Sequence, residues 1–289
     1  MTKILITGAN GQLGNEFRKL SINHSDWEFT FTDVDNLDIT NFSALESLCN
    51  QNQFNYIVNC AAYTAVDKAE NDLELATKLN RDAVKNLATV AAQIDAVLIH
   101  VSTDYVFNGM ACTPYTEDLS VSPTSAYGRT KAQGEEEALK YNKSLVIRTA
   151  WLYSTFGNNF VKTMLRLGSD RPEISVVFDQ IGTPTYAEDL ASAILSIIQN
   201  TNTNGAKPGI YHFSNEGVCS WYDFAWEIQN FAQTRCIVKP IESKDYPTPA
   251  KRPAFSVFNK SKIKSTFNID IPYWKTSLYK CLNSLINSN

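Results

Sequence analysis

Short apolar runs alternate with longer amphipathic stretches through the first half of the chain. Residues 3–7 (KILIT) predict a buried strand, after which Leu13, Phe17 and Leu20 recur at the spacing of one helix face. Similar apolar or alternating runs predict further strands at Trp27–Thr32, Tyr56–Cys60, Ala96–Ser102 and Ser144–Arg148, with helices at Glu74–Gln93 and Ala126–Tyr141. Strands that alternate with helices of this length indicate βαβ units. We therefore expect an α/β fold built on a doubly wound parallel sheet.

The second half of the chain has a different pattern, because polar and proline- or glycine-containing segments separate its apolar runs. These irregular segments are expected at residues 154–159, 200–209 and 246–253, and helices are expected at Asn159–Leu167, Ala187–Gln199 and Trp221–Thr234. Such a texture is typical of a smaller, mixed α/β substrate-binding domain. We expect residues 1–150 to form the first domain and residues 151–289 mainly the second.

A glycine-rich turn joins the first predicted strand to the first predicted helix. Gly8, Gly11 and Gly14 recur at a spacing of three, which suits a tight turn, close approach of a pyrophosphate and close packing of helix on strand. The amino terminus of the following helix would offer unpaired N–H groups and a positive dipole to the phosphates. The position of this motif, between a strand and an amphipathic helix, predicts a Rossmann-type dinucleotide-binding domain.

The sequence leaves the choice between NADH and NADPH open. Asp33 ends the second predicted strand, 19 residues beyond Gly14, where an acid would accept a hydrogen bond from the ribose 2′-OH of NAD(H). Arg18 and Lys19, on the first predicted helix, could instead serve the 2′-phosphate of NADP(H).

A second set of residues predicts carbonyl reduction. Tyr127 and Lys131 are four residues apart, so a helix places both on one face, and a nearby ammonium would lower the pKa of the phenol. Ser102 and Thr103 end another predicted strand, at the edge where doubly wound sheets bind ligands. A hydroxyl there could donate to a carbonyl oxygen while the phenol supplies a proton.

Composition and charge narrow the function classes. The chain has 289 residues, 26 basic and 30 acidic, giving a net charge of −4, so no basic stripe favours nucleic-acid binding. A mean hydropathy of −0.23 and the polar interruptions of its most apolar stretch argue against a membrane protein. The six cysteines and three histidines are scattered without metal-ligand spacings, and no signal-peptide pattern begins the chain. We expect a cytoplasmic protein with reduced thiols.

Several longer motifs resemble the extended short-chain dehydrogenase/reductases, and within them the dTDP-4-dehydrorhamnose reductase family. The resemblance runs nearly end to end and is carried by Gly8–Gly14, Asn59–Glu70 (NCAAYTAVDKAE), Ser102–Phe107 (STDYVF), Tyr127–Lys131, Arg148–Tyr153 (RTAWLY), Gly157–Leu165, Asp179–Thr185 and Tyr246–Pro253. It implies reduction, with NADPH or NADH, of the C4 keto group of dTDP-4-dehydro-L-rhamnose to dTDP-L-rhamnose, a precursor of surface polysaccharide. It also implies that residues around 176–199 return to the first domain.

The resemblance also implies roles for individual residues. Tyr127 would be the proton donor, Lys131 its partner and Thr103 the hydroxyl that polarises the carbonyl. Cofactor contacts would come from the glycine turn and from later loops, namely Gly8, Gly11, Gln12, Leu13, Gly14, Asp33, Asp38, Ile39, Ala62, Tyr63, Thr64, Tyr127 and Lys131. The dTDP-sugar would contact Thr103, Asp104, Trp151, Asn159 and Arg252.

Alternatives stay open at this point. A related nucleotide-sugar reductase or epimerase would use the same fold, whereas a dehydratase would need an acid where this chain has Tyr105. A non-catalytic NADP-binding regulatory subunit, like that of methionine adenosyltransferase, would bind a partner instead. Family members bind Mg²⁺, partly at subunit contacts, and Glu16 and Glu188 resemble acidic positions of that kind. Two isolated acids do not predict a metal site, so we assign no metal ligands and leave Mg²⁺ and a homodimer open.

Overall fold

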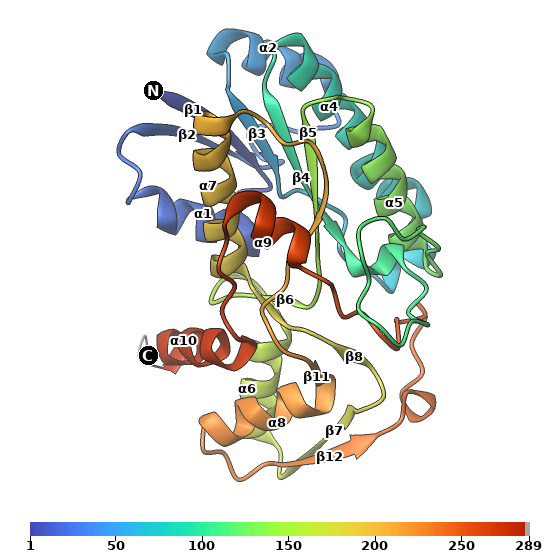
Figure 1. Ribbon diagram of the computed structural model, residues 1–289. Coiled ribbons are helices and arrows are strands. Elements are labelled where there is room, and N and C mark those ends of the chain that lie inside the picture. Colours follow the sequence, from blue (N-terminus) through green and yellow to red (C-terminus); the bar gives the residue numbers. More distant parts are fainter. Residues whose placement is uncertain (287–289) are drawn as a thin grey trace.

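The computed structural model describes residues 1–286, which form a sheet-centred upper part and a smaller lower part in Figure 1. The upper part is built on one parallel sheet, whose strand order is β10-β5-β4-β3-β1-β2. The strands are β1 (Thr2–Thr7), β2 (Trp27–Thr32), β3 (Tyr56–Asn59), β4 (Val97–Thr103), β5 (Ser144–Thr149) and β10 (Gly209–His212). The direction of winding reverses between β1 and β3, so their carboxyl ends lie at the switch point where such sheets bind ligands.

Helices cover both faces of this sheet, as Figure 1 shows. On one side, α1 (Gln12–Ser21) packs against α7 (Ala187–Asn204), and α9 (Ser261–Phe267) contacts α7 and β10. On the other lie α2 (Phe42–Asn52), α4 (Ala83–Gln93) and α5 (Ala126–Leu139). The alternation along each strand explains both layers. Along β1, for example, Ile4 and Ile6 pack on the α7 side, whereas Leu5 packs on the α4 side.

The lower part contains short strand pairs and three helices around a separate apolar cluster. The pairs are β6 (Leu152–Tyr153) with β9 (Thr185–Tyr186), β7 (Glu173–Val177) with β12 (Ile237–Ile241), and β8 (Ile181–Gly182) with β11 (Cys219–Ser220). The helices are α6 (Phe160–Asp170), α8 (Trp221–Phe231) and α10 (Trp274–Ile286). Phe224, Trp274 and Leu278 are among the fully enclosed members of this cluster.

The fold class predicted from the sequence is confirmed, while several element boundaries are wrong. The segment expected as one helix over 74–93 comprises α3 (Leu73–Thr77), a π turn (Lys78–Asp82) and α4. The expected irregular segment 200–209 is wrong in its first half, because α7 continues to Asn204. Helix α2, with its weak amphipathic pattern, and β10, in a segment rich in loop signals, escaped prediction.

Chain segments from the second half also contribute to the sheet layers. Strand β10 pairs with β5, and α7 lies on α1. Residues on the two sides of position 150 therefore contact one another within the sheet layers. The domain limits stay a prediction. No helix among residues 1–286 is long and apolar enough to cross a membrane.

Candidate active site

The glycine turn between β1 and α1 is shaped to receive an anion. Gly8 has φ +65°, and a Cβ on it would lie 2.6 Å from the backbone nitrogen of Ala61. A Cβ on Gly14 would lie 2.4 Å from the Cα of Ala9, so only glycine allows this close packing. Helix α1 begins after Gly11 with no side-chain cap and no acidic residue in its first turn. Its free N–H groups fit the pyrophosphate of a dinucleotide.

Polar groups beside this turn come from the end of β2, the strand next to β1, and from α1. Asp33 follows β2, and its carboxylate accepts hydrogen bonds from the backbone N–H groups of Asn10 (2.8 Å) and Val34 (2.8 Å). The guanidinium of Arg18 lies 4.5 Å from the ring centre of Phe31, on the same strand. An acid and a cation thus both lie near the end of β2, which suits either ribose or 2′-phosphate recognition.

The other residues expected to contact the cofactor lie in loops after β2 and β3. The Asp38 carboxylate accepts from the backbone N–H of Thr40, which lowers the pKa of Asp38. The carbonyl of Ile39 accepts from Asn86 on α4. The backbone of Tyr63 exchanges hydrogen bonds with the side chain of Asn80, which holds the loop that contains Ala62, Tyr63 and Thr64.

The carboxyl end of β4 brings Thr103, Asp104 and Tyr127 together. The Thr103 hydroxyl donates to Oδ1 of Asp104 at 2.9 Å and lies beside the phenol of Tyr127. Burial raises the pKa of Asp104 to about 6, although the neighbouring Thr103 and Ser256 hydroxyls oppose this rise. Tyr127 stands in the first turn of α5, which the Ser125 hydroxyl caps by accepting from the N–H of Gly128.

Lys131 lies one helical turn beyond Tyr127, as its spacing predicts, but its effect on the phenol differs from expectation. Burial raises the pKa of Tyr127 to about 12, and the neighbouring Thr103 hydroxyl opposes this rise. Burial also lowers the pKa of Lys131 to about 8. The Lys131 ammonium nitrogen donates to the Val101 carbonyl at 2.7 Å. The expected lowering of the Tyr127 pKa by Lys131 is therefore not seen in this structure, because Lys131 is engaged with β4.

A buried ion pair fixes α5 against the sheet. Glu135, one turn beyond Lys131, accepts from the guanidinium of Arg148 on β5 at 2.9 and 2.6 Å. The Ser102 hydroxyl also donates to Glu135, at 2.5 Å. Both charged side chains are at most 4% exposed, so each depends on the other for solvation. Sequence analysis missed this pair, although Tyr127, Lys131 and Glu135 share one helix face at four-residue spacing.

Two tryptophans stack beside the substrate side of the site. Trp151 follows β5 with φ +49°, and its ring lies 3.7 Å from that of Trp221 at an interplanar angle of 13°. A Cβ on Gly182 would come within 2.7 Å of the Trp151 ring. Glycine at that position and the stack together hold Trp151 in an uncommon backbone conformation. Trp221 was predicted only as the first residue of a helix.

The two remaining residues expected to contact substrate bind other parts of the chain. The Asn159 amide caps α6 by accepting from the N–H of Lys162, and it donates to Oε1 of Gln12 at 3.0 Å. Arg252 forms a two-pronged ion pair with Asp67, at 3.0 and 2.9 Å. The Asp67 carboxylate also accepts from the N–H of Ala250. This pair connects the loop after β3 to the loop that follows β12.

The acidic residues considered for Mg²⁺ have protein partners. Glu16 accepts from the Ser154 hydroxyl, and its pKa is raised by burial. Glu188 accepts from Lys19 at 2.9 Å and from Lys280 at 3.0 Å. Two cations thus already balance Glu188. Within residues 1–286 no group of three or more His, Cys, Asp or Glu side chains is arranged to hold a metal ion.

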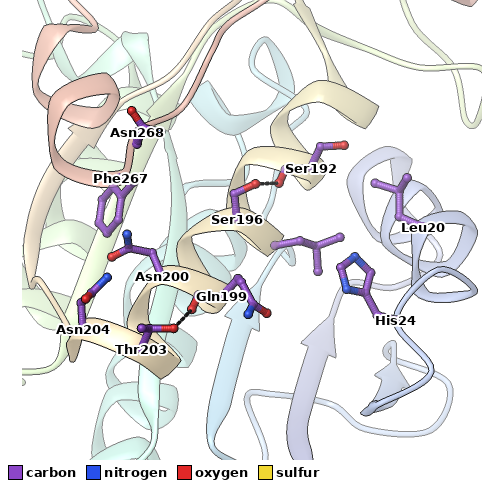
Figure 2. Close-up of a pocket in the computed structure, with 11 residues that line it drawn as sticks. Leu20, His24, Ser192, Ser196, Gln199, Asn200, Thr203, Asn204, Phe267 and Asn268 are labelled. Carbon is purple, nitrogen blue, oxygen red and sulfur yellow. Dashed lines mark hydrogen bonds between the residues drawn. The ribbon is translucent and has the colours of Figure 1, made fainter.

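A groove outside this site has a volume of about 650 Å³ and lies between α1, α7 and α9. In Figure 2 its labelled lining is mostly amide and hydroxyl side chains from α7, with Leu20 and His24 on one side and Phe267 and Asn268 on the other. None of the residues expected to bind cofactor or substrate lines it.

Comparison with known proteins shows which family this chain belongs to. Residues 1–287 match the family described as RmlD substrate binding domain. The chain belongs to this family. A dTDP-4-dehydrorhamnose reductase of Aggregatibacter actinomycetemcomitans is 42% identical over 286 residues, covering 96% of this chain and 97% of the relative. The reductase of Escherichia coli is 36% identical and covers 99% of this chain and 98% of its own length.

Solved structures of the RmlD family agree with the fold. The crystal structure of a dTDP-4-dehydrorhamnose reductase from Clostridium acetobutylicum has a TM-score of 0.93 and 44% identity, covering 99% of this chain and 100% of its own. The enzyme from Bacillus anthracis, solved in complex with NADP, has a TM-score of 0.93 and 38% identity, covering 98% and 100%. A dTDP-glucose 4,6-dehydratase of Bacillus anthracis, at 17% identity and a TM-score of 0.82, shares the fold.

Proposed function

We propose that this chain reduces the C4 keto group of dTDP-4-dehydro-L-rhamnose to give dTDP-L-rhamnose, using NADPH or NADH. The observation that carries the proposal is that Thr103, at the carboxyl end of β4, lies beside the phenol of Tyr127, with Lys131 one turn further along α5. Membership of the RmlD family and the names of its relatives support this substrate. The reaction belongs to dTDP-rhamnose biosynthesis, and we expect it to occur in the cytoplasm.

Each residue of the pair has a distinct task in this reaction. The bound nicotinamide supplies a hydride to the carbonyl carbon. Burial raises the pKa of Tyr127 to about 12, so the phenol holds its proton at neutral pH and gives it up only to a stronger base such as the developing alkoxide. The Thr103 hydroxyl, which donates to Asp104 in the free chain, can turn toward the carbonyl oxygen and stabilise the developing negative charge.

The cofactor would lie along the switch point of the sheet. Gly8, Gly11, Gln12, Leu13 and Gly14 would surround the pyrophosphate, and Asp33, Asp38, Ile39, Ala62, Tyr63 and Thr64 would line the path from adenosine to nicotinamide. A relative that binds NADP supports use of the phosphorylated cofactor, and the nearness of Arg18 to β2 supports the same choice. Asp33 supports the alternative, NADH.

The dTDP-sugar would contact residues from both parts of the chain. Asp104 follows Thr103 at the end of β4, and Trp151 comes two residues after Thr149, which pairs with Thr103; this arrangement supports assigning both residues to the sugar. Asn159 and Arg252 are assigned to the diphosphate or the nucleotide. The Asp67 carboxylate pairs with Nη1 and Nη2 of Arg252. Asp67 would therefore fix the orientation of the Arg252 guanidinium toward the ligand.

The test is the consumption of reduced cofactor, followed by loss of absorbance, with dTDP-, UDP- and GDP-linked 4-keto sugars compared at equal concentration. The proposal predicts stoichiometric oxidation with the dTDP sugar and much slower oxidation with the other two. A dehydratase is disfavoured because Tyr105 stands where the second acid would be needed. No oxidation with any keto sugar would favour the non-catalytic binding module.

A further inference from the structure

The loop between β6 and α6, from the second half of the chain, packs on the first two turns of α1. The Ser154 hydroxyl of this loop donates to Glu16 on α1 at 2.6 Å. A Cβ on Gly157 would come within 3.1 Å of the Cγ of Gln12. The amide nitrogen of Asn159 lies 3.0 Å from Oε1 of Gln12. The side chain of Gln12, the first residue of α1, is therefore held against the loop.

Backbone groups fix which way the two amides of this contact face. The N–H of Lys162 can only donate, and it lies 3.1 Å from Oδ1 of Asn159. The Ser154 and Phe156 carbonyls can only accept, and they lie 2.7 and 3.4 Å from Nδ2 of Asn159. Nδ2 therefore carries the hydrogens, and the atom of Gln12 that faces it is the acceptor Oε1. The two hydrogens of Nδ2 are both directed at groups of the protein.

The same orientation leaves the donor end of the Gln12 amide for a ligand. Nε2, the other terminal atom of this amide, carries two hydrogens that the contact with Asn159 does not use. Gln12 is partly exposed and directly follows the glycine turn, at the start of a helix whose first N–H groups have no side-chain cap. Backbone and side-chain donors thus lie together where the helix dipole favours an anion.

The contact with the loop also limits the freedom of the Gln12 side chain. A glutamine side chain loses rotamer entropy when it binds a ligand, and this loss opposes binding. A side chain that the protein already holds in one conformation loses less. The contact with Asn159 at one end and the close approach of Gly157 at Cγ hold Gln12 before any ligand is bound.

We propose that Asn159 is a positioning residue for Gln12, whose Nε2 amide donates to a diphosphate oxygen of a bound nucleotide. This role rests on the proposed function, in which the turn before α1 surrounds the pyrophosphate of the cofactor. Because Asn159 directs both of its own hydrogens at the protein, its contribution to a diphosphate would pass through Gln12. Both the cofactor and the dTDP-sugar carry a diphosphate, and the place of Gln12 beside the glycine turn favours that of the cofactor.

The test measures the dissociation constants of NADP⁺ and dTDP separately by isothermal titration calorimetry, so that no reduction takes place. Gln12→Met keeps the length of the side chain and removes both polar atoms. It should weaken NADP⁺ binding by about tenfold, as expected for the loss of one hydrogen bond to a charged group. Gln12→Glu keeps an acceptor for Asn159 but replaces the donor with a negative charge, so it should weaken binding at least as much.

Asn159→Ser separates positioning from direct contact, because serine also caps helices but is too short to reach Gln12. It should weaken NADP⁺ binding by about threefold in the wild-type background. It should have no further effect in Gln12→Met, since its action requires the Gln12 amide. Ser220→Ala is the control: it removes the cap of α8 and so lowers stability, but it should leave the affinity for NADP⁺ unchanged.

Unchanged affinity for both nucleotides in Gln12→Met would overturn the proposal, as would an equal effect of Asn159→Ser with and without the Gln12 amide. A loss confined to dTDP would assign the contact to the diphosphate of the sugar nucleotide. If a variant does not fold, nuclear magnetic resonance of the wild type decides, because the side-chain amide signals of Gln12 should move when a nucleotide binds. A wild type that binds neither nucleotide would contradict the proposed function, whereas equal binding in all variants contradicts this inference alone.

Discussion

The glycine turn and the carboxyl end of β4 build the two ends of the same site in different ways. At the turn, Asn10 and Gly11 are exposed and the expected contacts are backbone N–H groups at the start of α1. At the end of β4, Thr103, Tyr127 and Lys131 are all buried, and each is held by another side chain or a strand carbonyl. The close packing of the turn requires glycines, which have no side chain. The arrangement of the reactive end requires buried polar side chains that bind one another or the backbone. The two ends should therefore respond differently to substitution and to pH.

The largest effect is expected at the reactive end, from Tyr127→Phe. Loss of the proton donor should lower kcat by up to about 10⁴-fold, because the phenol is the group assigned to protonate the developing alkoxide. The dissociation constant of NADPH, measured by fluorescence titration, should change little. The matched control is Tyr105→Phe, whose ring lies 5.4 Å from that of Tyr127 and which has no assigned role. Comparable kcat values for the two variants would contradict the assignment.

Glu135→Gln should show how far the reactive end depends on its buried ion pair. The substitution keeps the shape of the side chain but leaves the Arg148 guanidinium buried without a counter-charge. We expect the free energy of unfolding to fall by about 3–5 kcal/mol, measured with urea. Lys140, 67% exposed and paired with Glu137 on the same helix, supplies a contrast: Glu137→Gln should cost under about 1 kcal/mol. Equal losses would show that burial does not distinguish the two pairs.

Gly14→Ala should disturb the turn without touching the reactive residues. Its new Cβ would overlap the backbone of Ala9, so α1 must shift, at a cost of about 1–3 kcal/mol in stability. The displaced N–H groups should weaken NADPH binding by about tenfold or more. Gly205→Ala is the control: its φ of +79° makes alanine similarly costly, about 1–3 kcal/mol, but nothing surrounds the added Cβ. Cofactor affinity should fall in the first variant alone.

Acid should destabilise the fold through His212, a buried residue of β10. Burial lowers the pKa of His212 to about 3, against about 6.5 in an unfolded chain. Below about pH 6.5 the unfolded chain takes up a proton that the folded chain does not, so stability falls as pH falls. At pH 5 the loss is about 2 kcal/mol for this residue. His212→Gln should flatten the pH dependence of urea unfolding between pH 5 and about 6.5, and an unchanged slope would show that His212 protonates freely in the fold.

The contrast between the two ends also explains what the sequence could predict. The turn is encoded within Gly8–Gly14, and the spacing of Tyr127 and Lys131 is encoded within one helix, so local patterns found both. The partners that solvate the reactive end lie on other strands. Arg148 was identified as the end of a strand and the start of a motif, and Asp67 only within the motif Asn59–Glu70, yet they hold Glu135 and Arg252 respectively. Periodicity carries no information about such long-range pairs.

The central claim is that a hydride passes to C4 of the sugar while the carbonyl oxygen on C4 receives its proton from Tyr127. It is tested most directly with the reduced cofactor deuterated at the transferred position and dTDP-4-dehydro-L-rhamnose, followed by mass spectrometry and NMR of the sugar. We predict one deuterium at C4 of dTDP-L-rhamnose for each cofactor oxidised. With Tyr127→Phe we expect almost no deuterated product in the same time. An isomerised sugar without deuterium, or an unchanged sugar with the cofactor still reduced, would contradict the account.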